Sequence, residues 1–249
     1  MKSIILAAGE GKRLRPLTND IPKCMVEVDG TPLIEHQINC LKRNGIKEIN
    51  ICLGYSSESV NFEGVNNFYN HDYYKTNMVY TLFCAESELV EEDIIISYGD
   101  INYNDEVLKK LIDNDSKIAV VSDRNWQEYW KDRMENPLDD AETFKLNPDG
   151  SILELGKKPR SYKDIEGQYI GLFKLRSDIV LSIKEFYHKL DRSLLYDGKD
   201  FNNMYMTTFL YLISKEVSPL TPVFINNGWI EIDEPSDLKH LQYLKNKNN

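Results

Sequence analysis

Ile4-Ile5-Leu6-Ala7-Ala8 runs directly into Gly9-Glu10-Gly11-Lys12-Arg13 near the start of the chain. The apolar run predicts a first buried strand, and the glycines after it predict a tight loop. Successive backbone N–H groups in such a loop can cradle phosphate oxygens, because glycine lets the backbone approach a ligand closely. Residues 9–23 hold four cations, which are Lys12, Arg13, Arg15 and Lys23. The opening of the chain therefore predicts a loop that binds a polyphosphate.

Two common phosphate-binding loops do not fit this stretch. A Walker A loop needs serine or threonine after Gly-Lys to hold magnesium, but Arg13 follows Gly11-Lys12. A dinucleotide-binding fingerprint needs a third glycine at the start of a helix, where this chain has Leu14. Pro16 and Pro22 predict that the segment stays a loop, since each removes a backbone donor. The glycines alone could form a plain tight turn, but the run as a whole favours ligand binding.

The same stretch resembles the signature of the nucleotidyltransferases that activate sugar phosphates and small phosphorylated alcohols. That signature reads Gly-x-Gly-x-Arg-x-x-Pro-x-Thr-x-x-x-Pro-Lys, and it is matched in register by Gly9, Gly11, Arg13, Pro16, Thr18, Pro22 and Lys23. Lys12 departs from it, since the family usually has threonine or serine there, and it adds a cation beside the phosphates. The resemblance implies a Rossmann-like α/β fold, the nucleotidyltransferase (GT-A-like) fold, with a mixed, mostly parallel sheet flanked by helices.

The resemblance also assigns roles to residues of the opening loop. It implies that Arg13 and Lys23 bind phosphates and take part in catalysis. The residues expected to contact the nucleotide here are Leu6, Ala7, Ala8, Gly9, Glu10, Gly11, Lys12 and Arg13.

Composition sets limits on the kind of protein. The chain has 249 residues, 41% hydrophobic and 28% charged, and a formal net charge of −10, which argues against a nucleic-acid groove. We see no signal peptide and no apolar stretch near the ~20 residues that span a bilayer, so we expect a cytoplasmic protein with no membrane partner. The four cysteines lack metal-ligand spacing and are expected to be free thiols. Without repeats or a clear linker, residues 1–249 are expected to form one nucleotidyltransferase domain.

The first half of the chain alternates apolar runs with helical patterns. Strands are expected at 48–53, 93–97 and 118–121, and helices at 32–44, 77–89 and 104–113. Repeated β–α–β units predict a parallel sheet covered by helices on both faces. After a polar and aromatic stretch at 123–140, we expect a hairpin at 143–155, strands at 168–174, 222–226 and 229–232, and helices at 177–190, 203–214 and 235–245.

Several candidate site residues follow strands of this expected sheet. In open α/β sheets, ligands lie at the carboxyl ends of the strands, which would gather the opening loop, Gly54, Tyr55 and Asp100 at one edge. Gly99, immediately before Asp100, is expected to contact the nucleotide, and Gly54 and Tyr55 are expected to line its base or ribose.

Asp100 and Asp233 are the candidate metal ligands. The resemblance implies that Asp100 holds Mg²⁺, an ion that binds through one or two carboxylates plus substrate phosphates. It also implies a second carboxylate from the segment 229–235, for which we expect Asp233, with Glu231 as the substitute. Capping of a turn or helix is the alternative role for both aspartates.

The expected mechanism follows from charge. A phosphorylated acceptor would attack the α-phosphate of a nucleoside triphosphate in line and displace pyrophosphate. Its phosphate has a second pKa of about 6, so it is mostly dianionic at neutral pH and needs no general base. The enzyme must then supply position and positive charge. Glu154-Leu-Gly-Lys157-Lys158-Pro159 resembles a family element whose lysine contacts the acceptor phosphate, so Lys158 is a third candidate catalytic residue; a solvated basic loop is the alternative.

CTP is the expected nucleotide. The Gln-rich base-binding element of the sugar-nucleotide branch is absent, and Tyr74-Lys-Thr-Asn77-Met-Val-Tyr-Thr-Leu82 resembles a segment of the phosphocholine cytidylyltransferases of bacterial surface-polysaccharide pathways. Asn77 is the candidate for the wall of the nucleotide crevice, with a helix N-cap as the alternative.

The acceptor is harder to infer. A choline pocket would present aromatic faces to a quaternary ammonium. Such faces could come from Trp126, Tyr129, Trp130 and Trp229, although aromatic residues more often pack a core. A zwitterion could equally be read by Asp123, Arg124, Arg133 and Arg160. The chain resembles the capsule-pathway cytidylyltransferases that use phosphoglutamine, as in phosphoramidate modification, which makes phosphoglutamine the expected acceptor; phosphocholine and sugar 1-phosphates stay open. The expected acceptor-binding residues are Lys23, Arg124, Trp126, Lys158 and Trp229.

Two other classes of protein fit parts of the sequence, a glycosyltransferase and a catalytically inactive binding protein. A nucleotide-sugar glycosyltransferase also has a Rossmann-like sheet and an Asp-x-Asp metal motif, which Asp100-Ile-Asn102 faintly matches, but it does not need the opening loop. A catalytically inactive binding protein would not be expected to keep Arg13, Lys23 and Asp100 together. Both a monomer and a homodimer fit the sequence.

Overall fold

A seven-stranded mixed sheet forms the centre of the computed structural model, which describes residues 1–244. Neighbouring strands run parallel except at β11, which is antiparallel to both β6 and β8. The spatial order is β12 (Thr221–Ile225), β8 (Ile118–Asp123), β11 (Gln168–Leu175), β6 (Ile94–Tyr98), β1 (Lys2–Ala7), β4 (Glu48–Leu53) and β5 (Asn66–Tyr69). The expected mixed, mostly parallel sheet is confirmed.

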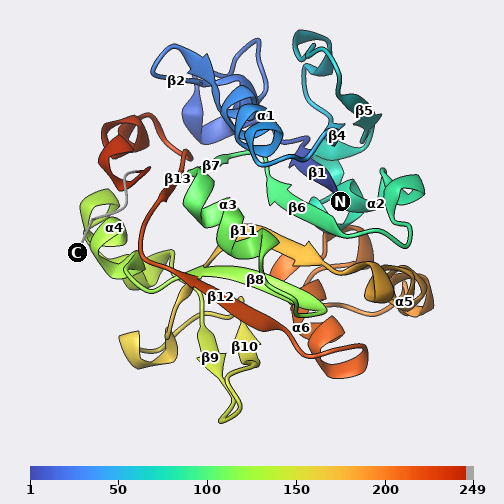
Figure 1. The fold of residues 1–249 in the computed structure, drawn as a ribbon. Coiled ribbons are helices and arrows are strands. Elements are labelled where there is room, and N and C mark those ends of the chain that lie inside the picture. Colours follow the sequence, from blue (N-terminus) through green and yellow to red (C-terminus); the bar gives the residue numbers. More distant parts are fainter. Residues whose placement is uncertain (245–249) are drawn as a thin grey trace.

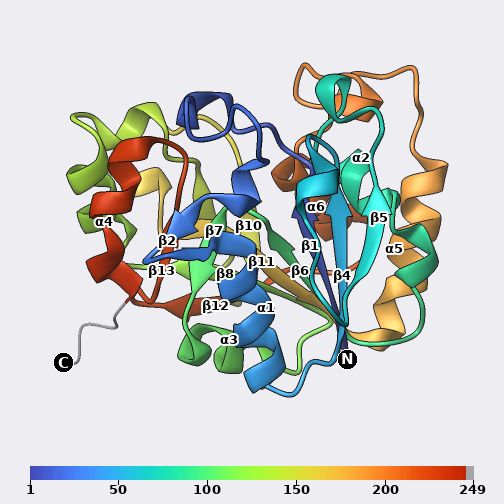
Figure 2. The same ribbon diagram turned by 90° about the horizontal axis from the view of Figure 1, so that it is seen from above.

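Helices cover both faces of the sheet (Figures 1 and 2). One face carries α1 (Leu33–Arg43) and α3 (Asp105–Ile112), and the other carries α2 (Met78–Phe83), α5 (Ser177–Lys189) and α6 (Met206–Glu216). Successive side chains of a strand point to opposite faces, so β1 contributes to two cores. Ile5 packs on the α1 side, and Ile4 and Leu6 pack on the α2 side. The central strands β1, β4 and β6 are therefore buried along nearly their whole length and are mostly apolar, because both of their faces are covered.

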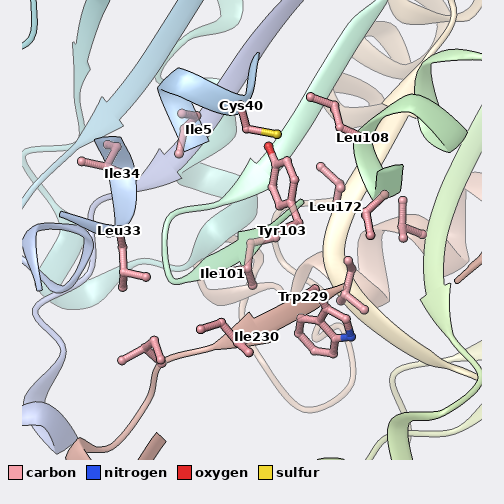
Figure 3. Packing of buried hydrophobic residues seen from close by; sticks show 14 of the residues in the cluster. Ile5, Leu33, Ile34, Cys40, Ile101, Tyr103, Leu108, Leu172, Trp229 and Ile230 are labelled. Carbon is pink, nitrogen blue, oxygen red and sulfur yellow. The ribbon is translucent and has the colours of Figure 1, made fainter. Parts of the chain in front are cut away.

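Three short antiparallel pairs lie outside the central sheet. They are β2 (Glu27–Val28) with β3 (Thr31–Pro32), β9 (Phe144–Leu146) with β10 (Ile152–Leu155), and β7 (Ile101–Tyr103) with β13 (Trp229–Glu231). The second pair confirms the expected hairpin. The third joins a segment that follows β6 to one near the end of the described chain. Figure 3 shows its residues Ile101, Tyr103, Trp229 and Ile230 in the core below α1.

The polar and aromatic stretch 123–140 contains α4 (Trp126–Arg133) and a 3₁₀ turn at Pro137–Asp139. Its aromatic residues Trp126, Tyr129 and Trp130 are buried, so their hydrophobic faces supply core packing. The C-terminal segment lies beside α4 (Figure 1), where the ring centroids of Tyr129 and Tyr243 are 4.9 Å apart.

Two expected helices are wrong in extent. The helix expected at 77–89 ends at Phe83, and a 3₁₀ turn at Glu86–Glu88 follows, which lets Ala85 and Leu89 both enter the core. The helix expected at 235–245 is two short 3₁₀ helices, Pro235–Lys239 and Leu241–Leu244, and Lys245 lies outside the described residues. The first of them is tied to α4, since Arg133 bonds to Asp237.

The cysteines and the length and polarity of the helices bear on two further expectations. All four cysteines are free, as expected, and Cys24, Cys40 and Cys52 are buried. Among residues 1–244, every helix is too short or too polar to cross a bilayer.

Gly171 allows β11 to bend where it passes Tyr98. Its φ is +82°, and the register of β11 against β8 shifts between Tyr169 and Phe173. A Cβ at this position would lie 2.5 Å from Cδ2 of Tyr98. We therefore expect Gly171→Ala to lower the free energy of unfolding by about 3 kcal/mol, from the left-handed backbone and the steric clash together.

Urea unfolding followed by circular dichroism would measure this loss. Gly150→Ala is the matched control, because Gly150 also has positive φ, +85°, but its Cβ would meet open space. The control should lose only about 1 kcal/mol. Equal losses in the two variants would show that the contact with Tyr98 is not what requires glycine.

Candidate active site

The opening loop is held together by its own hydrogen bonds. Gly11 adopts the left-handed conformation, with φ of 64°, and its carbonyl accepts bonds from the Leu14 N–H at 2.9 Å and the Thr18 hydroxyl at 2.7 Å. A Cβ on Gly11 would lie 2.9 Å from Cβ of Lys23. The glycines, the threonine and the lysine of the signature therefore form one compact unit. A 3₁₀ turn at Lys12–Leu14 departs from the expected irregular loop.

Lys23 lies between two carboxylates. Its Nζ is 2.7 Å from Oδ2 of Asp100 and also bonds to Oδ1 of Asp233. Arg13 reaches the same Asp233 oxygen at 3.0 Å through Nη2. Burial alone would lower the pKa of Lys23, but the charges of Asp100 and Asp233 outweigh it and raise that pKa. The structure thus brings together the two cations and the two carboxylates that the sequence singled out.

The β7–β13 pair places Asp233 beside Asp100. Glu231 is in register with Ile101, and the N–H of Ile232 donates to the Asp100 carbonyl at 3.0 Å. Three carboxylates, those of Asp100, Glu231 and Asp233, consequently have oxygens within 4.8 Å of one another. Burial, together with the charges of Asp233 and Asp100, raises the pKa of Glu231 to about 8. The burial of Asp233 is offset by Lys23 and Arg13, which leave its pKa below the ordinary value.

The donor set fits a hard divalent cation. Oδ1 of Asp100 is buried and has no hydrogen-bond partner within residues 1–244, although its other oxygen is bonded to Lys23. Carboxylate oxygens grouped in this way are the ligands that Mg²⁺ prefers. The side chains of Asp100, Glu231 and Asp233 are therefore the ones that could hold it.

Asp233 and Asn77, both considered as possible capping residues, differ in what their side chains bind. The turn after Asp233 is capped by Asp237, whose Oδ2 accepts the N–H groups of Asp233 and Glu234 at 2.7 and 2.8 Å. The Asp233 carboxylate is thus directed to the cations instead. Asn77 does cap α2, because its Oδ1 accepts the Met78 N–H at 2.7 Å, and it also lines two pockets.

Arg133 binds the carboxylates of Glu231 and Asp237, whereas the sequence suggested it only as a residue that could read a zwitterionic acceptor. Its side chain, 5% exposed, donates to Oε2 of Glu231 at 3.1 Å and to Oδ1 of Asp237 at 2.9 Å, and lies 3.8 Å from Oδ2 of Asp233. It also lies over the rings of Tyr129 and Trp130. The sequence held no signal for this role, since Arg133 is one of many charges in the stretch 123–140.

Three pockets meet at this cluster. The strand-end pocket, about 150 Å³, is lined by Leu6–Gly9, Asn77 and Gly99; the loop pocket, about 460 Å³, is lined by Gly9–Arg13 and Tyr74. Lys23 and Asp100 belong to both. The distal pocket, about 570 Å³, begins at Arg13, Glu231 and Asp233 and extends to Glu142 and Gln168. The cations and carboxylates therefore lie where the pockets join.

The pockets contain residues that sequence reasoning did not select. Tyr73, Thr76 and Met78 line the strand-end pocket, within or next to the segment that was compared with cytidylyltransferases. Glu142, Gln168 and Tyr169 line the distal pocket. No motif marks these positions, because they come together only when the start of β11 meets the loop before β9.

Other predicted site residues lie apart from the cluster. The N–H of Tyr55 donates to the Ala8 carbonyl at 3.2 Å, and Gly54 packs on Ala8 and Tyr73, so both support the loop beside the pockets. Lys158 donates to the carbonyls of Leu138 and Asp139 at 2.7 and 2.6 Å, in a side pocket of about 230 Å³ that shares Glu142 with the distal pocket.

The other three expected acceptor residues, which are Arg124, Trp126 and Trp229, lie in different places. The Arg124 guanidinium lies over the Phe224 ring, 3.8 Å from its centroid, and Trp126 is buried against Trp130. The structure brings neither to the cluster. Trp229 lines the distal pocket and donates its Nε1 proton to Asp123 at 2.9 Å. The roles of these residues stay predictions.

The sequence is similar to one family of proteins and to two curated enzymes. The sequence model of the family described as "Nucleotidyl transferase" matches residues 2–232. The chain is 45% identical over 249 residues to the CTP:phosphoglutamine cytidylyltransferase of Campylobacter jejuni, covering 96% of this chain and 98% of that protein. It is 43% identical over 99 residues to the choline-phosphate cytidylyltransferase of Streptococcus pneumoniae, covering 38% and 43% respectively.

Among solved structures, the chain is similar in fold to the CTP:phosphocholine cytidylyltransferase of Streptococcus pneumoniae. The TM-score is 0.72 at 24% identity, with 98% of each chain covered.

Proposed function

Since the chain belongs to the nucleotidyl transferase family, we propose that it transfers CMP from CTP to phosphoglutamine and releases pyrophosphate. The observation that carries the reaction is the position of Lys23, held between Asp100 and Asp233 where the glycine loop meets the pockets. The choice of CTP and of phosphoglutamine rests on the similarity along nearly the whole chain to the Campylobacter jejuni enzyme. Membership of the family also disfavours the glycosyltransferase alternative.

The opening loop is proposed to hold the triphosphate. Gly9–Arg13 line the loop pocket, where their backbone N–H groups and the exposed side chains of Lys12 and Arg13 would neutralise negative charge. Lys12 pairs with Glu10 at 3.2 Å in the structure, so a triphosphate would compete with that carboxylate for the ammonium. The strand-end pocket, between Ala8, Asn77 and Thr81, is proposed to take the base and ribose.

The chemistry is proposed to depend on position and charge. An acceptor phosphate oxygen forms a bond to the α-phosphorus while the bond to the bridging oxygen breaks, and pyrophosphate leaves with that electron pair. Lys23 and Arg13 face the place where negative charge develops, and such preorganised cations stabilise a transition state. The attacking phosphate is already a dianion, so this step needs no side chain as a base.

Mg²⁺ is proposed as the cofactor. Asp100 and Asp233 would hold it, with Glu231 as the third candidate. When bound, the ion would withdraw charge from the phosphate oxygens.

The remaining expectations stay proposals of the same kind. They are a single domain over residues 1–249, a monomer or homodimer, a cytoplasmic location, and a role in modifying surface polysaccharide.

Pyrophosphate release tests the proposed reaction. We expect release with Mg²⁺, CTP and phosphoglutamine, and much less with UTP, ATP or GTP. Phosphocholine and several sugar 1-phosphates complete the panel. Release with UTP and a sugar phosphate would keep the family and overturn the proposed substrates. If no pairing gave pyrophosphate, nucleotidyl transfer itself would have to be abandoned.

A further inference from the structure

Glu142 is a carboxylate without an ion pair in the described chain, although it shares the side pocket with Lys157 and Lys158. It lines the distal pocket, and within residues 1–244 no ion pair or hydrogen bond reaches its side chain. Its neighbour Asp140 at least accepts the Nε1 proton of Trp130 at 3.1 Å. Burial, and then the charge of Asp140, raises the pKa of Glu142 to about 7. A partly buried carboxylate that lacks a partner is less stable than a solvated one, so its place in a pocket wall needs an explanation.

Two further polar groups lie in the same wall with unmet hydrogen-bonding capacity. Gln168 is 5% exposed, and its Oε1 accepts the N–H of Glu142 at 3.3 Å, which leaves the amide NH₂ to donate. Tyr169 is 7% exposed, and its hydroxyl is buried without a hydrogen-bond partner in the described chain. A buried hydroxyl is normally satisfied, so the Tyr169 hydroxyl, with the unused carboxylate of Glu142 and amide NH₂ of Gln168 in the same wall, indicates a polar ligand.

The charge of the pocket shows which kind of ligand fits. Arg13, at the mouth, is the only cation among the described residues that line it, and it is paired with Asp233. The far end holds Asp140 and Glu142. A phosphate is therefore favoured near Arg13 and Lys23, and a positive charge is favoured at the far end.

We propose that Glu142 binds an ammonium group of the acceptor, and that the Gln168 amide donates to a carbonyl or carboxylate oxygen beside it. This inference rests on the proposed function, and it names the acceptor class as a phosphorylated amino acid. A quaternary ammonium has no N–H to donate and would leave the Glu142 and Tyr169 oxygens unmet. A sugar phosphate would bring no charge to the carboxylate.

The experiment combines one enzyme variant with one altered acceptor. Phosphorylated glutaramate, which is phosphoglutamine without its α-amino group, removes the proposed ammonium. Glu142→Gln removes the charge and keeps the shape. We expect each single change to raise the acceptor KM about 10- to 100-fold, and the double change to add little, because both delete the same charged hydrogen bond. The KM for CTP should not change.

Controls separate recognition from folding. The melting temperature of Glu142→Gln should equal or exceed that of the wild type, because the variant removes a partly buried charge that has no ion pair. Glu216→Gln, an exposed carboxylate at the end of α6, should leave both KM values unchanged. Equal losses by Glu142→Gln with both acceptors would overturn the inference.

The outcomes also separate this inference from the proposed function. Pyrophosphate release only with acceptors that lack an ammonium would overturn the role of Glu142 and leave nucleotidyl transfer intact. If no acceptor supported release, the proposed function would fail, and calorimetric titration of phosphoglutamine into wild type and Glu142→Gln would still decide the inference. Equal binding by the two proteins, or none by either, would contradict it.

Discussion

Replacing Asp100 with asparagine is expected to lower the rate of pyrophosphate release by about 10³-fold. Asparagine keeps the shape of the side chain but removes the charge that faces Lys23 at 2.7 Å and faces the oxygens of Asp233 and Glu231. The oxygen of Asp100 that has no partner in the described chain would no longer be an anionic ligand. Because the reaction depends on neutralising phosphate charge, losing one member of this group should affect the chemical step directly.

The loss should appear in metal binding as well as in turnover. Titration with Mn²⁺, followed by electron paramagnetic resonance in the presence of CTP, should show binding at least 10-fold weaker in Asp100→Asn. Asp178→Asn makes the same chemical change in an exposed pair with Arg176 and should alter neither property. An Asp100→Asn variant with turnover within a few-fold of the wild type would remove Asp100 from the proposed machinery and restore the capping interpretation.

Replacing Arg133 with methionine is expected to lower the free energy of unfolding by about 3–5 kcal/mol. The guanidinium is almost fully buried and donates to both Glu231 and Asp237. Its removal leaves these carboxylates close to Asp233 without their shared counter-charge. Asp237 also accepts the N–H groups that shape the turn after Asp233, so the position of the candidate metal ligands depends on the same contacts.

Urea denaturation would measure this loss. Arg133→Lys keeps the charge but cannot donate to Glu231 and Asp237 with the planar geometry of a guanidinium. It should therefore recover only part of the stability that Arg133→Met loses. Arg176→Met removes an exposed arginine from its pair with Asp178 and should cost about 0–1 kcal/mol. A cost below 1 kcal/mol for Arg133→Met would show that the network does not hold the carboxylates in place.

Local patterns in the sequence predicted most of the sheet. The strands β1, β4 and β6 each contain a run of mostly apolar residues with no strict alternation, which is typical of a strand buried on both faces. The opening loop could be recognised for a similar reason, since all of its signature residues lie between Gly9 and Lys23. Their mutual contacts, such as Thr18 with the Gly11 carbonyl, connect residues close in sequence.

Predictions failed where a distant contact overrode the local pattern. The helical spacing of 235–245 did not reveal that Asp237 would be bonded to Arg133, which holds the segment in short 3₁₀ turns. The aromatic residues of α4 suggested a ligand-binding face; the structure buries Trp126 among other rings, and its acceptor role stays a prediction. Composition alone cannot separate these two uses of an aromatic side chain, because both need the same apolar surface.

The sequence by itself determined the strands, the cation-rich loop and the identity of Asp100 as a carboxylate at the end of a strand. Only the tertiary structure showed that Asp233 and Glu231 both lie beside Asp100, what supports these two carboxylates, and what lies at the far end of the distal pocket. Asp233 reaches Asp100 because β13 pairs with β7, and Glu142 meets Gln168 because β11 runs antiparallel between β6 and β8. Backbone hydrogen bonds between strands are the same for every residue type, so a strand's own sequence shows which faces are buried but not which distant segment will lie beside it.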